Sequence, residues 1–241
     1  MRAILVCVDY ADLLALTIPY NLHHFSSVLV VTSVADVATK ELTKAIGVDL
    51  FVTDSFYSNG AVFNKWLALE EGLDYLGRNG LLCIMDADVL WPKTIPAFDY
   101  QVGSLYTPRR RVLKIVDQTL DVDTIVWSDV PLYNDVEFAG YSQIFYAEDA
   151  TLGEAPWHQV DWAHAGGADS FFQNKWGANH RIRPPFDVIH LGDPGKNWCG
   201  RSTPYLDGTI HPEAALRMEQ LKTFRRNRTH GPDRFKHERI P

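Results

Sequence analysis

Residues Leu81–Pro92 read LLCIMDADVLWP, and this stretch decides the fold. Five apolar residues run directly into two carboxylates, Asp86 and Asp88. A short, continuous apolar run is typical of a strand that is buried on both faces, at the centre of a parallel sheet. In open α/β sheets, ligands bind at the carboxyl ends of the strands. The stretch therefore predicts a central strand with a binding site at its end.

The two carboxylates at this strand end indicate a cation site. Asp86 and Asp88 repel each other and resist desolvation when they leave a buried strand together. A bound cation removes both costs, and carboxylate oxygens suit Mg²⁺ or Mn²⁺. Mg²⁺ usually completes its coordination shell with water and substrate phosphates, so we expect a metal–diphosphate site. The alternative is a strand-end turn in which Asp86 caps the following residues.

Apolar runs and helical patterns alternate before this central strand. Asp12 is a candidate N-cap for the first helix, and Gly47 is a stop signal for the second. Four strands that alternate with three helices predict an α/β fold with a mostly parallel central sheet flanked by helices. The predicted strands are 2–8, 27–32, 49–53 and 81–85, and the predicted helices are 12–18, 33–47 and 62–76.

The alternation ends after Asp88, and the chain shows no clear linker. We expect a single domain over 1–221, divided into a nucleotide-binding half at 1–91 and an acceptor half at 92–221. Later elements are predicted as a strand at 140–147, a helix at 170–176, a strand around 186–189 and a helix at 212–226. Residues 222–241 form a basic tail, with seven basic residues against two acidic ones in a chain of net charge −7. Such a tail suggests an anionic partner.

The cysteines and the apolar runs indicate the compartment. No apolar run is long enough to span a bilayer. Cys7, Cys83 and Cys199 are odd in number and lack metal-site spacing, so we expect buried free thiols in a reducing compartment. These features predict a cytoplasmic protein without a membrane partner.

Four stretches carry a resemblance to a known family. They are Val8-Asp9-Tyr10; 30–36, which ends in Asp36; Phe63-Asn64-Lys65 with the following Asp-x-Asp; and His190 with Lys196 and Trp198. Together they resemble the GT-A-fold glycosyltransferases of the broad family-2-like group, over roughly residues 3–198. The resemblance implies a GT-A, Rossmann-like fold that binds a nucleotide sugar.

The resemblance also implies roles for residues of this chain. Asp9 and Tyr10 would hold the nucleotide base and ribose, Asp36 would face uracil, and Lys65 would contact the donor. The stretch from His190 to Trp198 is similar to the His-x5-Lys-x-Trp loop of glycogenin-like transferases. There, the histidine binds the metal and the lysine contacts the diphosphate. The expected metal ligands are Asp86, Asp88 and His190, and the other expected donor contacts are Asp86, Lys196 and Trp198. The chain departs from that pattern in Asn197, where relatives have proline, and in its glycines at 192 and 195.

Asp169 is the candidate catalytic base. It follows Gly166-Gly167-Ala168 at the start of a predicted helix, where inverting relatives carry a carboxylate that takes a proton from the acceptor hydroxyl. The alternative role is that of a helix N-cap. Asp161, Glu148 and Asp149 are rival candidates, and His164 lies close by in the sequence.

Together, these expectations predict a metal-dependent glycosyltransferase that uses Mn²⁺ or Mg²⁺. It would move a sugar from a UDP-sugar to an acceptor hydroxyl, with inversion, although the His190–Lys196 loop also occurs in retaining enzymes. A sugar nucleotidyltransferase is the second candidate, but residues 9–12 are acidic and lack the glycine-rich phosphate loop of that class. The third candidate is a binding module without catalysis.

The acceptor has two candidates. The chain is similar to small, soluble family-2-like transferases of bacteriophages, some of which add sugars to hydroxymethylated pyrimidines in DNA. Arg109–Arg111 and the basic tail could hold a phosphate backbone, which predicts a DNA acceptor and a site of action in the host cytoplasm. A saccharide acceptor is the alternative.

Overall fold

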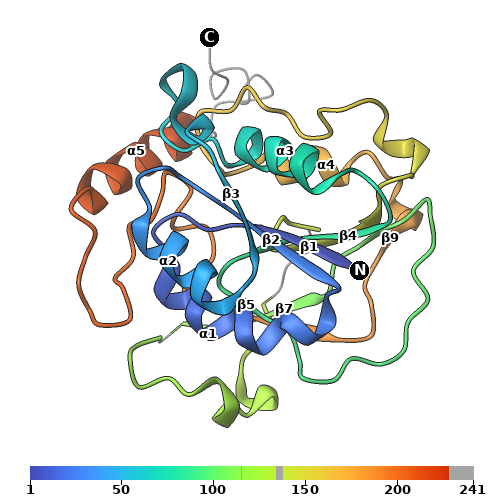
Figure 1. Cartoon of the computed structure of the whole chain (residues 1–241), viewed down its shortest axis with the longest axis horizontal. Coiled ribbons are helices and arrows are strands. Elements are labelled where there is room, and N and C mark those ends of the chain that lie inside the picture. The colour runs from blue at the N-terminus through green and yellow to red at the C-terminus, as the bar shows by residue number, and fades with distance from the viewer. Residues whose placement is uncertain (115, 134–137, 228–241) are drawn as a thin grey trace.

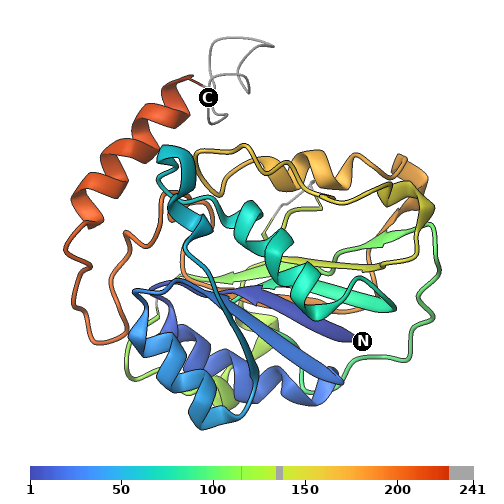
Figure 2. The ribbon, with the colours of Figure 1, turned by 45° about the horizontal axis from the view of Figure 1, so that its top comes forward.

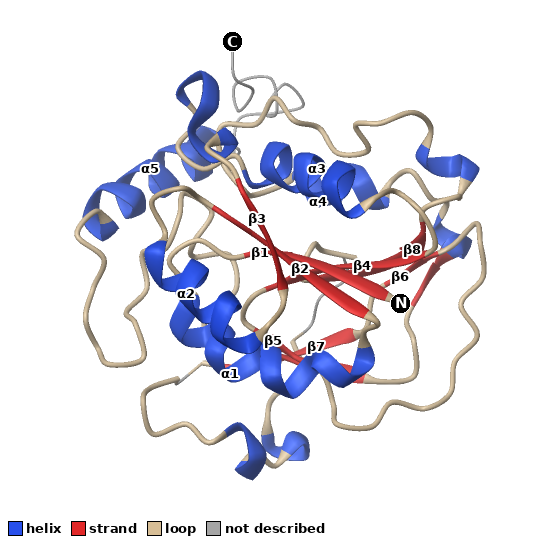
Figure 3. Ribbon diagram, viewed as in Figure 1, coloured by secondary structure: helices blue, strands red, loops and turns tan. Residues whose placement is uncertain are grey.

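A seven-stranded sheet with helices on both faces forms the body of the protein (Figures 1 and 3). The computed structural model describes residues 1–114, 116–133 and 138–227. The sheet order is β3-β2-β1-β4-β8-β6-β9. The predicted α/β class with a mostly parallel central sheet is confirmed. The strands are β1 (Arg2–Val6), β2 (Ser27–Thr32), β3 (Asp49–Val52), β4 (Leu81–Asp86), β6 (Leu105–Tyr106), β8 (Ser142–Tyr146) and β9 (Arg181–Ile182).

The predicted central strand, β4, lies between a parallel and an antiparallel neighbour. β1 pairs with β2 and with β4 in parallel, and its last residue, Val6, lies opposite Asp86. β8 pairs with β4 in antiparallel orientation, from Leu81 opposite Tyr146 to Met85 opposite Ser142. The carboxyl ends of β1, β2 and β4 therefore meet at one edge, where Asp86 leaves the sheet.

Alternate side chains of the central strands enter two different cores. Ile4 and Val6 of β1 pack with Trp66 and Leu69 of α3 on one face, whereas residues such as Leu5 pack toward α1 on the other. This double burial explains the continuous apolar runs. Figure 2 shows α3 and α4 above the sheet and α1 and α2 below it. The helices are α1 (Ala11–Asn21), α2 (Val37–Ile46), α3 (Lys65–Leu76), α4 (Ala168–Gln173) and α5 (Ala214–Asn227).

A second, three-stranded sheet brings the two ends of the predicted site together. Its order is β5 (Val89–Leu90), β10 (Asp187–Leu191) and β7 (Arg109–Leu113). β5 begins directly after Asp88 and pairs with β10 in antiparallel orientation, with His190 opposite Val89. The Leu191 N–H donates to the Asp88 carbonyl at 2.8 Å. This pairing places His190 beside Asp88, although about a hundred residues separate the two in the sequence.

Helix ends follow the sequence signals in part. Asp36 caps α2 by accepting from the Thr39 N–H at 3.0 Å, and Gly47 ends that helix at φ 79°, where glycine costs no steric strain. The N-cap prediction for Asp12 is wrong, because α1 begins at Ala11 with Tyr10 at the N-cap. The side chain of Asp12 binds Arg201 instead.

The chain after the second sheet packs against the body as a loop and a helix. The boundary that we expected between residues 221 and 222 falls inside α5, and the rest of the basic tail, 228–241, lies outside the described residues. Cys7, Cys83 and Cys199 are free and buried, as expected. Within the described residues, no helix has the length and apolar content that crossing a membrane requires.

Candidate active site

Asp86, Asp88 and His190 converge at the carboxyl end of β4. One ligand atom from each lies within 4.8 Å of the others. The His190 Nε2 is 3.6 Å from the Asp88 Oδ1, which is beyond hydrogen-bond distance. Both side chains are buried, at 8% exposure for Asp88 and 7% for His190. The structure therefore brings together the three residues that we expected to bind a metal.

The chemistry of this cluster fits a divalent cation. The buried Asp88 Oδ1 and His190 Nδ1 have no hydrogen-bond partner among the described residues, and a buried polar atom left in this state is costly. Burial raises the pKa of Asp88, the neighbouring Asp86 raises it further, and His190 opposes the shift. A cation would favour the ionised form of Asp88 and would accept a lone pair from its Oδ1. Two carboxylates with one imidazole suit Mn²⁺ as well as Mg²⁺.

Lys65, at the start of α3, forms an ion pair with Asp86. It is the first residue of α3, after Asn64 has capped that helix by accepting from the Leu67 N–H at 3.0 Å. Its ammonium forms an ion pair with the Asp86 Oδ1. The ammonium also lies 5.0 Å from the Trp66 ring centre, within cation–π range. A positive charge thus lies beside the cluster.

The loop after His190 is fixed by the contact of Trp198 with Gly166. A Cβ atom at Gly166 would lie 2.2 Å from the Trp198 ring, so only glycine fits there. The Ala165 N–H donates to the Trp198 carbonyl at 2.8 Å, and the His164 ring stacks on the indole at 6.0 Å. The two glycines before α4 therefore have different roles. Gly166 leaves room for the Trp198 ring, and Gly167 is the N-cap of the helix.

Lys196 lies on this loop with its side chain exposed. No ion pair or hydrogen bond engages its ammonium within the described part of the chain. Arg225 of α5 lies nearby, since its Nη2 donates to the Gly195 carbonyl at 2.6 Å and its guanidinium lies 5.1 Å from the Trp198 ring centre. Two cations thus border the loop that the sequence assigns to a diphosphate.

We expect Lys196→Ala to lower turnover by about 100-fold, the scale of losing one electrostatic stabiliser. The melting temperature should not change, because the ammonium supports no contact in the described fold. Steady-state kinetics and thermal denaturation would measure both quantities. Lys44→Ala, at an exposed lysine of α2, is the matched control. A Lys196 variant with wild-type turnover would make this loop structural.

Asp169 lies in the first turn of α4, while Gly167 occupies the N-cap. The N-cap alternative for Asp169 is therefore wrong. Its Oδ2 accepts from the Gly140 N–H at 2.9 Å, and its Oδ1 accepts from the Ser170 N–H at 3.0 Å. These two bonds orient the carboxylate and leave lone pairs on both oxygens. The carboxylate can still accept a proton from a bound hydroxyl.

One cavity of about 1070 Å³ connects these groups. The metal-ligand cluster, Lys65, Lys196, Trp198 and Asp169 all line it. The rival acids Asp161, Glu148 and Asp149 do not line it. Asp149 instead accepts from the Trp176 Nε1 at 2.7 Å and from two backbone N–H groups. Of the acids considered as a base, Asp169 alone faces this cavity.

Two predicted donor contacts lie outside this cavity. The Asp36 carboxylate accepts from the Asp9 N–H at 2.8 Å and from the hydroxyl of Thr39 at 2.7 Å, in addition to its capping bond. Asp9 has φ 64°, and its carboxylate pairs with Arg217 at 2.8 Å. Their predicted contact with a base stays a prediction. Tyr10, the third member of that group, does line the cavity.

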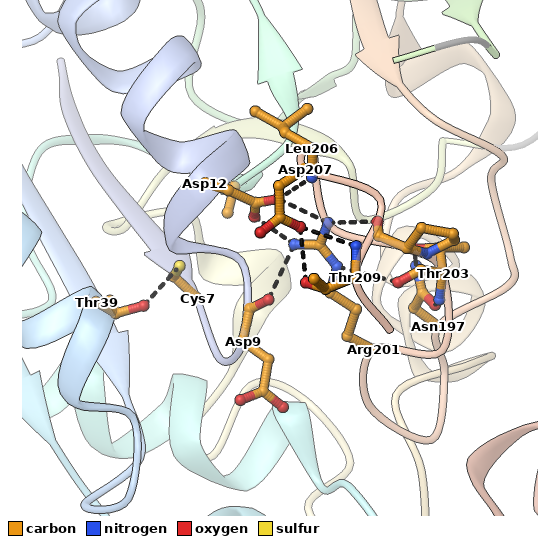
Figure 4. Close-up of polar contacts among 12 residues, drawn as sticks. Cys7, Asp9, Asp12, Thr39, Asn197, Arg201, Thr203, Leu206, Asp207 and Thr209 are labelled. Carbon is orange, nitrogen blue, oxygen red and sulfur yellow. Dashed lines mark hydrogen bonds and ion pairs between the residues drawn. The ribbon is translucent and has the colours of Figure 1, made fainter. Parts of the chain in front are cut away.

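Sequence reasoning missed Arg201, which ties the C-terminal segment to the β1–α1 turn (Figure 4). Its side chain is 1% exposed, and its guanidinium binds both oxygens of Asp12 and the Asp9 carbonyl. The rings of Tyr10 and Tyr205 lie 4.7 and 4.3 Å from the guanidinium carbon. No local motif predicts the role of Arg201, because its partner Asp12 lies 189 positions away in the sequence.

We expect Arg201→Met to lower the free energy of unfolding by about 3 kcal/mol. This is the low end for breaking a buried ion pair, since Asp12 keeps 20% exposure and can recover some water. Urea denaturation would measure the change. Arg226→Met, which removes an exposed arginine from α5, is the control and should leave the denaturation midpoint unchanged. Equal midpoints for Arg201→Met and the wild type would contradict the role of this contact.

The three consecutive arginines do not form one basic surface. Arg109 and Arg111 both pair with Asp187 of the neighbouring strand, at 2.8 and 3.0 Å. Arg110 points to the other face of β7, where it lines the large cavity and lies 4.4 Å from the Tyr141 ring centre. Of these three arginines, Arg110 alone lines the large cavity and adds its positive charge there.

Comparisons with known proteins identify no family for this sequence. No family model matches it, and no curated protein matches it. Among solved structures, glucosyl-3-phosphoglycerate synthase from Mycobacterium tuberculosis is similar at 12% identity, 80% coverage of this chain, 72% coverage of that chain and a TM-score of 0.49. Mannosyl-3-phosphoglycerate synthase from Rubrobacter xylanophilus gives 14%, 97%, 79% and 0.48 for the same quantities. A 4-diphosphocytidyl-2C-methyl-D-erythritol synthase from Anaerococcus prevotii gives 10%, 92%, 95% and 0.40.

Proposed function

We propose that this chain is a divalent-metal-dependent glycosyltransferase of the GT-A type. It transfers a sugar from a UDP-sugar to an acceptor hydroxyl, with inversion. One observation carries the proposal: a single cavity contains a three-ligand metal cluster, the ammonium of Lys196 and the carboxylate of Asp169. These are the groups that are needed to bind a diphosphate, stabilise its departure and activate a hydroxyl.

The donor binds at the cluster side of this cavity. A divalent cation held by Asp86, Asp88 and His190, Mn²⁺ or Mg²⁺, would neutralise the diphosphate as it leaves. Lys196 contributes a mobile positive charge to the same phosphates, and Lys65 holds Asp86 in place through their ion pair. Trp198 forms a wall of the cavity beside Lys196.

Asp169 acts on the acceptor. Its carboxylate takes the proton of the acceptor hydroxyl while the oxygen attacks the anomeric carbon of the sugar. The bond from that carbon to the phosphate oxygen breaks, and its electron pair leaves with the nucleoside diphosphate. The Gly140 and Ser170 N–H groups hold the two oxygens of Asp169 in place, so the base is oriented before the acceptor binds. Attack from the side opposite the leaving group inverts the anomeric centre.

A screen of nucleotide sugars tests this function. The protein is incubated with Mn²⁺ and each of several UDP-, GDP-, ADP- and CDP-sugars without an acceptor, and products are identified by mass spectrometry. Slow release of free sugar and nucleoside diphosphate would support glycosyl transfer. In a parallel incubation with a nucleoside triphosphate and a sugar phosphate, formation of pyrophosphate would instead support the nucleotidyltransferase. Binding of nucleotide sugar without any turnover would favour the binding module.

The acceptor candidates are the hydroxymethyl group of a modified pyrimidine in DNA and a saccharide hydroxyl. Arg225 and Arg226 favour DNA, since they lie exposed on the end of α5 that borders the cavity, and more basic residues follow in the chain. The pairing of Arg109 and Arg111 with Asp187 removes two other phosphate contacts that a DNA acceptor could have used.

Transfer to hydroxymethylated duplex DNA distinguishes these acceptors. A DNA acceptor predicts binding that weakens steeply with salt, and that weakens again in the double variant Arg225→Gln and Arg226→Gln. Absence of DNA binding at low salt, together with transfer to a free saccharide, would establish the second acceptor class.

A further inference from the structure

The wall of the large cavity beyond Asp169 is rich in hydrogen-bond donors. α4 carries Asp169 in its first turn and ends at Gln173, with Asn174 as its C-cap, and all three residues line the cavity. Arg181, the first residue of β9, lines it as well, and its Nη1 donates to the Asn174 Oδ1 at 3.3 Å. A helical rise of about 1.5 Å per residue separates Asn174 from Asp169 by about 7.5 Å along the axis of α4. One sugar or one nucleotide can bridge such a span.

The two amides on this wall use their oxygens inside the protein. The Gln173 Oε1 accepts from the Phe138 N–H at 2.7 Å, and the Asn174 Oδ1 accepts from Arg181. Within the described part of the chain, no acceptor is bonded to the Gln173 Nε2 or the Asn174 Nδ2, and no ion pair engages Arg181. Because these residues line the cavity, their N–H groups can donate to a ligand there.

Arg110 adds a second cation to the same wall. Its side chain is 9% exposed, and its guanidinium carbon lies 4.4 Å from the Tyr141 ring centre. Tyr141 follows Gly140, whose N–H donates to Asp169 at 2.9 Å. We define the acceptor wall as Arg110, Tyr141, Asp169, Gln173, Asn174 and Arg181. The other acids that line the cavity lie in the metal-ligand cluster or on the loop of Lys196, so this wall carries two cations against one carboxylate.

Two guanidinium groups and two amide N–H groups suit an oxyanion. Phosphate and carboxylate oxygens accept from both kinds of donor, and the bonds from a guanidinium are charge-assisted. A neutral saccharide would need acceptors on the wall as well, because each of its hydroxyls also donates. The two arginines would in addition offset the repulsion between a bound anion and the Asp169 carboxylate.

We propose that the acceptor wall binds a phosphate or carboxylate group of the acceptor while Asp169 takes the proton of its hydroxyl. This inference rests on the proposed function and narrows the acceptor to an anion. A phosphodiester of DNA and a phosphorylated or carboxylated saccharide both supply the required group, and a neutral saccharide does not.

Binding of inorganic phosphate tests this site before the acceptor is known. The donor side is first filled with Mg²⁺ and with whichever of UDP, GDP, ADP and CDP binds most tightly, and equilibrium dialysis with radiolabelled phosphate then measures the remaining site. We expect a dissociation constant on the order of 1 mM for the wild type. It should rise at least about tenfold in Arg181→Gln, the effect of about 1.4 kcal/mol.

A second variant and a control complete the measurement. Asn174→Asp replaces an amide by a carboxylate of the same shape at an exposed position, so it should fold normally and weaken phosphate binding at least as much. Arg109→Gln, whose side chain is 58% exposed on the other face of β7, is the matched control and should bind phosphate as the wild type does. Equal phosphate binding by the wild type and Arg181→Gln would overturn the assignment.

Two pairs of acceptors distinguish the sources of the anion. They are 5-hydroxymethyl-2′-deoxycytidine with its 5′-monophosphate, and glucose with glucose 6-phosphate. Transfer to the nucleotide in preference to its nucleoside would support a nucleic-acid acceptor, and transfer to the sugar phosphate in preference to glucose would support a phosphorylated saccharide. Equal transfer to the charged and uncharged members of a pair would overturn the inference.

The outcomes separate this inference from the proposed function. Release of sugar from a nucleotide sugar by a wild-type protein that does not bind phosphate would overturn the inference and leave the function standing. A wild-type protein that binds none of the four nucleoside diphosphates would overturn both together.

Discussion

Asp88→Asn should abolish the thermal stabilisation that Mn²⁺ gives to the wild-type protein, and turnover should fall by at least about 1,000-fold. Asp88 contributes a buried oxygen without a hydrogen-bond partner among the described residues, so its amide replacement removes a metal ligand and breaks no described hydrogen bond of that atom. A ligand at 100 times its dissociation constant stabilises a protein by about 2.7 kcal/mol, which the variant should not gain.

The same substitution should not destabilise the metal-free protein. Burial raises the pKa of Asp88 because the ionised form is poorly solvated there, and Asp86 adds repulsion. A neutral amide avoids both costs. We therefore expect the melting temperature in EDTA to equal or exceed that of the wild type. This combination distinguishes a metal ligand from a structural aspartate, whose loss would lower stability with and without metal.

Two further proteins complete this test. His190→Ala should weaken Mn²⁺ binding and lower turnover by about 100-fold, since His190 lies 3.6 Å from Asp88 in the same cluster. Asp129→Asn, at an exposed aspartate that does not line the large cavity, should behave as the wild type. Full wild-type activity in excess EDTA would refute the metal assignment for all three ligands.

Much of this cluster could be predicted because its signals are local. An apolar run that ends in Asp86 and Asp88 implies a buried strand with acids at its end, and β4 has that form. His190 and Lys196 were identified through the resemblance of their loop to that of glycogenin-like transferases. What local spacing could not show is how the chain brings His190 to Asp88, which depends on β5 pairing with β10.

The parts that sequence reasoning missed depend on long-range contacts. Arg201 looks like any arginine in a polar loop, and only the folded chain places it on Asp12. Asp12 was expected to cap α1, but an ion pair with a buried guanidinium outweighs a capping bond of about 1 kcal/mol. Asp36, which the resemblance placed against uracil, caps α2 and also accepts from the Asp9 N–H and from the hydroxyls of Thr32 and Thr39.

The catalytic role that we propose for Asp169 predicts the second large effect. Asp169→Asn should lower turnover by about 100- to 10,000-fold, the contribution of a general base, and leave the dissociation constant of the nucleotide sugar unchanged. The amide can retain the bond from the Gly140 N–H through its oxygen, so the shape of the cavity should persist. The bond from the Ser170 N–H to the other oxygen is lost together with the ability to take a proton. Stopped assays of transfer, with donor binding measured by calorimetry, would separate these two quantities.

Asp161→Asn is the matched control, because Asp161 is the nearest rival in sequence and does not line the large cavity. It should retain wild-type turnover. The turnover of Asp169→Asn is the quantity that decides. Near-normal turnover in that variant would leave the Gly140 contact as the function of Asp169 and would direct the search for the base to Asp161. Inversion at the anomeric carbon would then lose its structural support, because no other acid that we considered as a base faces the cavity in the described part of the chain.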